Sequence, residues 1–473
     1  MARQRIVVVT PDVVGEKMAG PAIRAWKIAE ALAVEHEVRL LSTVECTRSS
    51  DFFVTKFVTA KQFAQEMSWA DIVIHQGDVT ATQPSLIKSN AIKVADLYDP
   101  LHIEVIEQNR GRDLTEQTLI WSSTLGSVIL QLATSDFFLC ASEKQRDFWL
   151  GNLAARGRVN PILPGEEGGI DRLLAIVPFG LDPNPPQKQR KVLRGVQPGI
   201  DEGDYILLWG GGIYNWFDPL TLIRAVARVA REMPQTRLVF MGATHPNPNV
   251  PAMKMAQNAR DLSAELGLTD RHVFFLEGWV PFDERGDYLL EADVAVSTHL
   301  AHLETDYSFR TRLLDCFWAA LPVIATDGDS LSTLITQEGA GCSVPAGNVD
   351  LLVAAILKYG KDIDARQRAA DASGRLAARF SWSVVLEPLV RFCQDPEPAG
   401  DLEFGFTQAK IRSLSRMRSI SGHGIFPLGK RSKNFFGLAK QRDWAKIKER
   451  TRLHLSPRYL AISRRRRKAE RDL

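Results

Sequence analysis

Short apolar segments alternate with longer amphipathic ones along the first part of the chain. The short segments are rich in Val, Ile and Leu and predict buried strands at residues 5–10, 37–43, 70–75, 93–98, 136–141 and 174–178. Apolar residues recur at mostly helical spacing over residues 21–34, where Pro21 suits a first helical turn, and residues 114–132 predict a second helix. Strands that alternate with helices in this way form a largely parallel sheet.

The alternation then breaks and restarts. Closely spaced prolines, followed by Lys and Arg, predict an interdomain linker at residues 178–192. The next strands are predicted at residues 205–209, 237–240, 272–276, 293–297 and 322–326, and the next helices at residues 219–232, 252–266, 308–320, 349–359 and 364–380. We therefore predict an α/β fold of two Rossmann-like, doubly wound domains, residues 1–180 and 181–400, that face each other across a cleft, with a basic tail at residues 401–473. Ligands of such sheets bind at the carboxyl ends of the strands.

The composition is that of a globular protein long enough for more than one core. The chain has 473 residues, of which 45% are hydrophobic and 24% are charged. No apolar run reaches the ~18 residues that span a bilayer, and the first residues lead from two arginines directly into a strand, so we expect a cytoplasmic protein. The five cysteines are scattered and form no C-x-x-C pair, which predicts neither a disulfide framework nor a zinc site.

Charge is distributed unevenly along the chain. Residues 401–473 carry 20 Lys and Arg against 6 Asp and Glu, a net +14, so with +3 overall the rest of the chain carries −11. Aliphatic and aromatic side chains are interspersed among these cations, a mixture that is typical of interfacial anchors on anionic lipid. We therefore expect the tail to bind the cytoplasmic face of a membrane. A solvated tail is the alternative, and nucleic acid is disfavoured because the body is acidic and no nucleic-acid module is recognisable.

Five motifs follow one another in an informative order. They are a glycine loop backed by a basic helix at residues 19–26, Trp209-Gly210-Gly211-Gly212, Gly278-Trp279-Val280, Glu291-Ala292-Asp293-Val294, and the block from Ser308 to Ile324. In this order they resemble the GT-B glycosyltransferases of family 4, over most of residues 3–393. The resemblance implies retaining transfer of a sugar from a nucleotide-sugar donor to an acceptor hydroxyl, with no cofactor and no metal, and with residues 382–393 crossing back to the first domain.

Glycines after the first strand of the second half predict a nest for the donor diphosphate. Gly210, Gly211 and Gly212 follow a predicted strand and precede a predicted helix. Glycine allows close backbone approach, and the amino end of a helix favours anions. Gly20 supports the same interpretation on the opposite wall. The alternative is a tight turn without a ligand.

The predicted helix at residues 308–320 carries the remaining donor residues. Ser308, Arg312 and Asp315 share one helical face, and Arg312 can bind a diphosphate bidentately, joined by Arg310. The resemblance implies that Asp315 accepts hydrogen bonds from the ribose hydroxyls of the donor. The alternative is a surface salt bridge between Arg312 and Asp315.

The chain also departs from the family pattern in this region. The Arg and Lys that family members carry after the first strand of the second half are missing from residues 213–218. The family's first motif acid is replaced by Tyr307, with Glu304 three residues upstream. Because these cations are missing, we expect Arg310 and Arg312 to supply the positive charge that binds the diphosphate.

Three candidates for catalysis lie near the predicted strand ends. The resemblance implies that Glu304, expected in the loop at residues 298–306, holds donor-sugar hydroxyls and steadies positive charge at the anomeric carbon. Asp99 or His102 is expected to orient or deprotonate the acceptor hydroxyl. The alternatives are a solvated Glu304 and a buried or capping His102. Arg24 and Arg146 are assigned to the acceptor side.

The predicted function is glycosyl transfer to a glycan or a lipid-linked saccharide in cell-surface polysaccharide synthesis. A nucleotide-sugar epimerase of the same fold, which needs no acceptor, and a non-catalytic sugar-binding scaffold are the alternatives. The sequence leaves the sugar, the nucleotide and the acceptor open.

Overall fold

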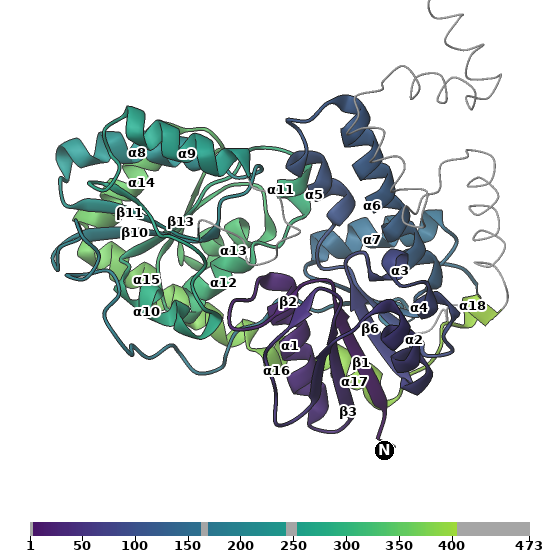
Figure 1. Ribbon diagram of the computed structural model, residues 1–473. Helices are drawn as coiled ribbons and strands as arrows, with labels where there is room; N and C mark the ends of the chain where they lie inside the picture. The colour runs from purple at the N-terminus through teal and green to yellow at the C-terminus, as the bar shows by residue number, and fades with distance from the viewer. Residues whose placement is uncertain (1–2, 162–168, 243–252, 404–473) are drawn as a thin grey trace, which may run out of the picture. The chain divides into compact units, whose positions relative to one another are not determined.

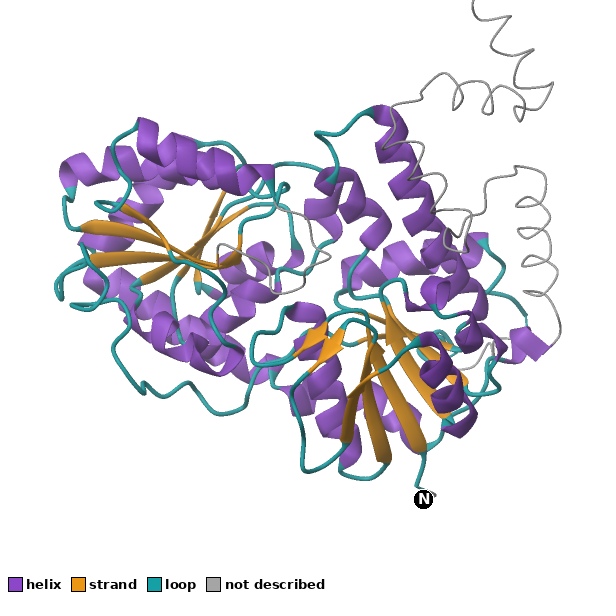
Figure 2. Ribbon diagram, viewed as in Figure 1, coloured by secondary structure: helices purple, strands orange, loops and turns teal. Residues whose placement is uncertain are grey.

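The computed structural model describes residues 3–161, 169–242 and 253–403, and these form two parallel sheets flanked by helices (Figures 1 and 2). The first sheet has the strand order β5-β3-β1-β6-β7-β8-β9. Its strands are β1 (Arg5–Thr10), β3 (Glu37–Ser42), β5 (Val54–Phe57), β6 (Ile72–Gln76), β7 (Ile92–Asp96), β8 (Phe137–Cys140) and β9 (Leu174–Ile176). A separate parallel pair joins β2 (Val13–Val14) to β4 (Glu45–Cys46).

The second sheet has the order β12-β11-β10-β13-β14-β15. Its strands are β10 (Tyr205–Gly212), β11 (Thr236–Gly242), β12 (Val273–Phe275), β13 (Val294–Ser297), β14 (Val323–Thr326) and β15 (Gly341–Val344). In both sheets the order reverses direction beside the first strand, β1 or β10, which is the switch-point topology of doubly wound folds. The predicted α/β fold of two Rossmann-like halves is confirmed.

Helices cover both faces of each sheet, as the ribbon shows (Figure 2). Those of the first half are α1 (Gly20–Ala33), α2 (Ala60–Trp69), α3 (Val79–Thr82), α4 (Pro84–Lys88), α5 (Leu101–Gln108), α6 (Leu114–Thr134) and α7 (Glu143–Ala155). Those that follow are α8 (Pro219–Glu232), α9 (Lys254–Glu265), η1 (Phe282–Glu284), α10 (Arg285–Glu291), α11 (Leu303–Tyr307), α12 (Thr311–Trp318), α13 (Ser330–Glu338), α14 (Val349–Lys361), α15 (Ile363–Ala377), η2 (Ala378–Phe380), α16 (Trp382–Val385), α17 (Glu387–Gln394) and α18 (Gly400–Glu403).

Local sequence explains these elements directly. Residues 6–9 are at most 1% exposed, as expected for a central parallel strand that is covered on both faces. Helix α8 begins with Pro219, whose missing N–H costs nothing at a first turn. The side chain of Asp218 caps this helix by accepting from the amide of Thr221 at 3.0 Å.

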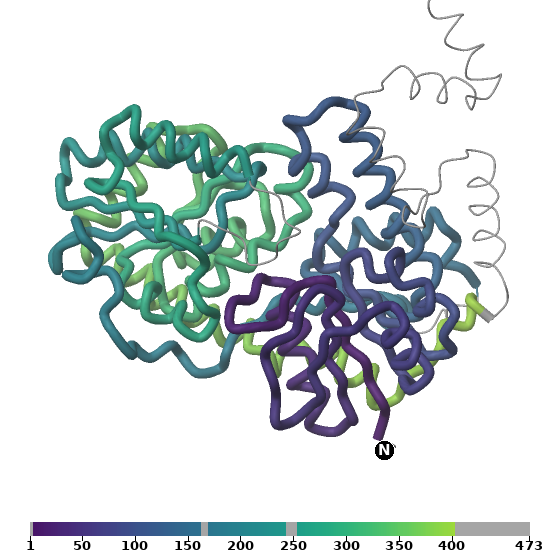
Figure 3. The backbone as a smooth tube through the Cα atoms, in the orientation of Figure 1, coloured from purple at the N-terminus to yellow at the C-terminus, as the bar shows by residue number. Residues whose placement is uncertain are grey.

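The last helices return to the first half, as the tube through the backbone lets the reader follow (Figure 3). The rings of Phe137 on β8 and Phe392 on α17 stack with centroids 4.1 Å apart. The buried guanidinium of Arg158 binds Asp401 at 2.5 Å. The predicted crossing back at residues 382–393 is therefore confirmed.

Three boundaries differ from the prediction in ways that affect the site. Strand β10 continues through the glycines to Gly212 instead of ending at residue 209. The helix expected from residue 308 begins at Thr311, and Glu304 lies in the short helix α11 instead of a loop. The tail prediction falls on residues outside the described part, apart from residues 401–403.

Candidate active site

The glycine-rich end of β10 is only partly covered, since Gly210 and Gly211 are half-buried and Gly212 is buried. The pairing of β10 with β11 shifts register between Trp209 and Gly212, and Gly211 has a φ of +80°, which disfavours any residue with a side chain. A Cβ on Gly210 would meet no described atom within 4 Å. The backbone here therefore has room for a ligand to approach.

The helix after this strand contributes less to anion binding than its position suggests. The carboxylate of Asp218 already accepts the amide of Thr221 at the start of α8, and Asp218 itself is 5% exposed. A capped helix end with a buried acid offers little to a phosphate. The expectation that free N–H groups of this helix face the glycines is weakened accordingly.

Arg312 reaches the glycines from α12. Its Nη2 donates to the carbonyl of Gly212 at 2.9 Å, and its guanidinium lies 4.1 Å from the ring centroid of Phe217 and 5.4 Å from that of Trp209. Its buried Nη1 has no hydrogen-bond partner within the described ranges. Burial lowers the pKa of Arg312 to about 10, so the side chain is still a cation at neutral pH.

Asp315 does not pair with Arg312. Its carboxylate accepts instead from Nε of Arg285 at 3.1 Å, so the alternative of a surface salt bridge between Arg312 and Asp315 is wrong. Ser308 precedes α12 and does not share its helical face, although its buried Oγ lacks a hydrogen-bond partner among the described residues.

Glu304 and Arg310 form a buried ion pair. They are 2% and 5% exposed, and both Nη atoms of Arg310 donate to the carboxylate of Glu304, at 2.8 and 2.6 Å. Glu304 is therefore not a solvated loop residue. The charge of Arg310 is neutralised by this pair, which leaves Arg312 as the better-placed cation for a diphosphate.

The first half contributes the amino end of α1 to the same region. A Cβ on Gly20 would lie 3.8 Å from Oη of Tyr98 and 4.0 Å from Oγ1 of Thr311, the first residue of α12. Neither α1 nor α12 has a side-chain cap in the described structure. Two uncapped helix ends, one from each half, therefore lie close together, an arrangement that favours an anion.

Next to these helix ends, the side chain of Gln145 forms hydrogen bonds with residues of both halves. Nε2 of Gln145 on α7 donates to the carbonyl of Tyr98 at 2.8 Å and to that of Tyr307 at 2.7 Å. The predicted donor and acceptor residues are thereby brought to one region.

The turn from β7 into α5 contains two carboxyl groups, one of which the sequence prediction missed. Burial raises the pKa of Asp99 to about 6. Burial also raises the pKa of Glu104, in the first turn of α5, well above its usual value, and the nearby charge of Asp99 raises it further. The available signal was Pro100, which marks the start of the helix and so places Glu104 in its first turn.

His102 lies in an aromatic environment. Its ring stacks on that of Phe148 and is tilted against that of Trp149, each at 5.7 Å between centroids. Burial lowers its pKa to about 4, so the imidazole is neutral at pH 7 and is a weak base. Of the two acceptor-side candidates at this turn, the structure favours Asp99.

Arg24 is buried completely, at 0% exposure. It donates from Nε and Nη2 to Asp96 at 2.6 and 2.9 Å, and to the carbonyls of Val177 and Pro178, each at 2.8 Å. These bonds tie α1 to the ends of β7 and β9. The acceptor-side role of Arg24 stays a prediction that its contacts do not support.

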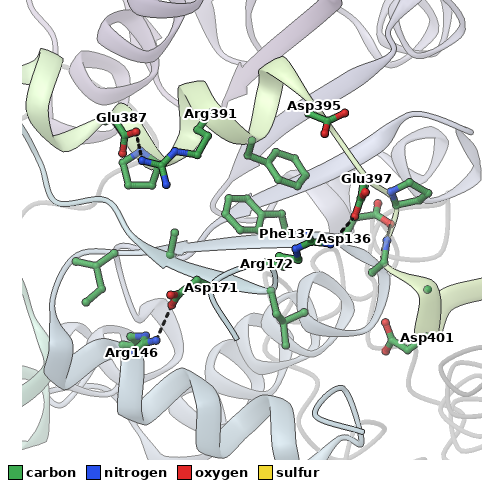
Figure 4. Close-up of a pocket in the computed structure, with 18 of the residues that line it drawn as sticks. Asp136, Phe137, Arg146, Asp171, Arg172, Glu387, Arg391, Asp395, Glu397 and Asp401 are labelled. Carbon is green, nitrogen blue, oxygen red and sulfur yellow. Dashed lines mark hydrogen bonds and ion pairs between the residues drawn. The ribbon is translucent and has the colours of Figure 1, made fainter. Parts of the chain in front are cut away.

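Arg146 lies away from the donor residues, in a separate cavity of about 920 Å³ (Figure 4). It binds Asp171 at 2.7 Å there, and Phe137, Arg391 and Glu397 also line the walls. None of the predicted donor residues lines this cavity.

The described ranges contain no group of three or more His, Cys, Asp and Glu that could hold a metal ion. No helix within them is both long and apolar enough to cross a bilayer.

Comparison with known protein families finds a match in the second half of the chain. Residues 204–362 match the family described as "Glycosyl transferases group 1". This segment is a glycosyltransferase group 1 domain. The D-inositol 3-phosphate glycosyltransferase of Thermobispora bispora is 28% identical over 185 residues, 39% of this chain and 42% of the relative. The phosphatidyl-myo-inositol mannosyltransferase of Mycolicibacterium smegmatis is 24% identical over 179 residues, 38% of this chain and 42% of the relative. The chain therefore matches less than half the length of these glycosyltransferases.

Solved structures extend the likeness to both halves. Anabaena Alr3699/HepE, in complex with UDP and glucose, has a TM-score of 0.61 at 13% identity, and the match covers 83% of this chain and 100% of that chain. WaaG, a glycosyltransferase involved in lipopolysaccharide biosynthesis, has a TM-score of 0.57 at 15% identity, with 82% and 99% covered. At these identities the likeness shows the fold, and it confirms the GT-B architecture.

Proposed function

We propose that this chain transfers a sugar from a nucleotide-sugar donor to an acceptor hydroxyl. The observation that carries the proposal is Arg312, a half-buried cation beside the glycine end of β10 whose buried Nη1 has no hydrogen-bond partner among the described residues, within a glycosyltransferase group 1 domain. Arg312 stands in for the Arg and Lys that residues 213–218 lack. A guanidinium that is already oriented by Gly212 loses little freedom when it binds phosphate.

In this proposal the donor diphosphate lies between Arg312, the backbone of Gly210 and the uncapped ends of α1 and α12. Solved structures with this fold include complexes with UDP and glucose and with UDP-glucose, so UDP-glucose is the first donor to test. The helix ends and Arg312 neutralise the leaving diphosphate without a metal. Asp315, oriented by Arg285, binds the ribose hydroxyls.

The reaction forms a bond from the acceptor oxygen to the anomeric carbon and breaks the bond from that carbon to the diphosphate. The acceptor proton passes to Asp99, whose carboxylate is ionised at neutral pH because its pKa is about 6. Glu304, held by Arg310, steadies the positive charge that develops at the anomeric carbon. Retention of anomeric configuration is part of the proposal.

We further propose a lipid-linked saccharide or a glycan as the acceptor, at the cytoplasmic face of a membrane. The mannosyltransferase relative is named for phosphatidyl-myo-inositol, WaaG is described by its part in lipopolysaccharide biosynthesis, and the +14 tail suits an anionic surface. A role in cell-surface polysaccharide synthesis follows from this choice of acceptor.

The test begins with binding and ends with product. UDP-glucose, UDP-N-acetylglucosamine and GDP-mannose are titrated into the full chain by calorimetry, and the tightest binder is then incubated with and without extracts of lipid-linked saccharides. We expect acceptor-dependent release of the nucleotide and a product with the donor's anomeric configuration by NMR. An epimerised donor formed without an acceptor would support the epimerase alternative, and binding without turnover would support the scaffold.

A further inference from the structure

The exposed face of the first turns of α6 carries no charge. The buried residues of this helix begin at Gly126, so the turns ahead of Gly126 are covered only in part. Leu114, Leu119 and Trp121 in these turns are 78%, 49% and 37% exposed. Together with these three, the exposed residues between positions 114 and 125 are Thr115, Thr118 and Ser122. None of the six is ionisable, and their spacing places them on one side of the helix, which we call the α6 face.

Helix α8 shows what a water-facing helix of this protein looks like. Its exposed residues are Arg224, Arg228, Arg231 and Glu232, all of them charged, while its apolar residues are buried or half-buried. A helix face toward water is normally polar or charged in this way. The uncharged and partly apolar α6 face therefore indicates a partner other than water.

The charged residues at the tip of the α5–α6 hairpin are paired within the hairpin itself. Arg110 binds Glu107 at 2.5 Å, and Arg112 binds Glu116, the one charged residue of α6. Asp113 caps α6 by accepting from two amides of its first turn, at 3.0 and 3.1 Å. These charges have partners already, so recognition by the α6 face has to be apolar.

The hydroxyl groups on the α6 face are bonded within the helix. Oγ1 of Thr118 donates to the carbonyl of Leu114 at 2.7 Å, and Oγ of Ser122 donates to that of Leu119 at 3.1 Å. A hydroxyl that is bonded to its own backbone loses little when water is removed. Tryptophan, here Trp121, is enriched where hydrocarbon meets the lipid headgroups. This composition suits the interfacial layer of a bilayer.

The hairpin also starts at the acceptor side of the candidate site (Figure 1). Helix α5 begins at Leu101, two residues after Asp99, and packs against α6. With eight residues, α5 is about 12 Å long. A surface that lies against the first turns of α6 is therefore one short helix away from Asp99, a distance that the saccharide head of a lipid-linked acceptor can span.

We propose that the α6 face rests on the interfacial layer of a lipid bilayer, with Leu114, Leu119 and Trp121 entering among the acyl chains. One apolar patch of this size holds weakly alone, because stable anchoring takes two signals. The +14 of residues 401–473 supplies the other signal. The delivery of a lipid-linked acceptor to Asp99 by this contact rests on the proposed function, whereas the contact itself is measured without any transfer reaction.

The test compares variants of the full chain on vesicles that contain phosphatidylglycerol. The partition coefficient is measured by flotation at a series of salt concentrations. We expect Leu114→Gln/Trp121→Gln to lower it about tenfold at every salt concentration, because apolar burial in the interface is lost. The decline with salt should stay as steep as in the wild type, because the charges of the tail are unchanged.

Two further variants serve as controls. Leu114→Met/Trp121→Phe keeps the apolar surface and should bind as the wild type does. Leu351→Gln/Ile363→Gln changes two apolar side chains of the second half, 47% and 66% exposed on α14 and α15, and should leave binding unchanged. All these side chains are exposed, so we expect the melting temperatures to stay close to that of the wild type.

Several outcomes would overturn the proposal. They are no binding by the wild type, equal partition coefficients for the wild type and Leu114→Gln/Trp121→Gln, and an equal loss in the control on α14 and α15. A wild-type dimer in light scattering that Leu114→Gln/Trp121→Gln dissociates would assign the α6 face to a second copy of the chain instead. Calorimetry with UDP-glucose is run on the same proteins. A failure of donor binding there counts against the proposed function and leaves the vesicle result standing.

Discussion

At the scale of single residues, the candidate site depends on which charges are already neutralised. Arg24, Arg310 and Arg158 each meet a buried carboxylate within 2.6 Å or less, whereas Arg312 contacts only a carbonyl and aromatic faces among the described residues. A partly buried guanidinium without a counter-ion is destabilising unless a bound anion pairs with it. Arg312 is therefore the cation that a nucleoside diphosphate would use.

Replacing Arg312 by Ala tests this directly. We expect the affinity for the nucleotide-sugar to fall by about 2 kcal/mol, roughly 30-fold in Kd, because a bidentate, charge-assisted contact is lost. Calorimetry with UDP-glucose or the tightest binder measures the change. Arg228→Ala, on the surface of α8 beside Asp350, is the matched control. Unchanged affinity in Arg312→Ala would place the diphosphate elsewhere.

Substitutions of Asp99 and His102 should affect turnover to different extents if Asp99 accepts the proton. Asp99→Asn should lower turnover by about 100-fold or more while leaving donor affinity nearly unchanged, because a positioned base contributes that much. His102→Asn should have a smaller effect, since its pKa of about 4 leaves it neutral and weakly basic. The wild-type rate should also decline as the pH falls through about 6, where Asp99 gains its proton. Equal losses of turnover in Asp99→Asn and His102→Asn would show that His102 also takes part in proton transfer.

At the scale of elements, the unusual feature is the bulged, glycine-rich end of β10. Gly211 requires a positive φ, and a Cβ there would lie 3.8 Å from Nη2 of Arg312. Gly210 has no such requirement and faces open space. Gly211 is therefore expected to matter for folding, and Gly210 for donor binding.

We expect Gly211→Ala to destabilise the protein by about 1–2 kcal/mol, because an L-residue is strained at this φ. Gly210→Ala should leave the melting temperature close to that of the wild type and still weaken donor binding, because its methyl group occupies the space proposed for the diphosphate. Thermal unfolding and donor titration on both variants measure the two effects. Normal donor affinity in Gly210→Ala would mean that the diphosphate does not approach this backbone.

The elements themselves were predictable from sequence to a large extent. Central parallel strands are continuous apolar runs, so β1, β6 and β8 appear directly in the sequence, and Asp218-Pro219 marks the start of α8. The extension of β10 through three glycines and the short helix α11 were not predicted, because tertiary contacts there override local preference.

The site was predictable only in part. The family resemblance selected Arg312, Asp315 and Glu304, but it gave no information on partners that lie far away in sequence. The Arg24–Asp96 pair joins positions 72 residues apart, and no local pattern encodes it.

At the scale of the whole molecule, the chain leaves its folded body beside Asp401. The buried pair of Asp401 with Arg158, together with the bond from the amide of Ala399 to Asp136 at 3.0 Å, belongs to the first half. A truncation intended to remove the basic tail must therefore retain these residues. Ending the chain at Pro398 would leave Arg158 buried without its carboxylate, at a cost of about 3–5 kcal/mol.

The membrane role of the tail is best tested with a chain that ends at Glu403. We expect the full chain to co-sediment with vesicles containing phosphatidylglycerol at low salt and the shortened chain to remain in the supernatant, since each Lys or Arg near an anionic surface contributes about 1 kcal/mol. Binding should weaken at 0.5 M salt, where such charges are screened. Equal partitioning of both forms would remove the proposed role.

The return of the last helices has a consequence for synthesis on the ribosome. The face of β8 that receives Phe392, and the guanidinium of Arg158, stay without their partners until about 400 residues have been translated. All strands of the first sheet have been translated by Ile176, well before β15 completes the second sheet. The first half nevertheless waits for α17 and Asp401, so the half that is translated earliest is the last to be finished.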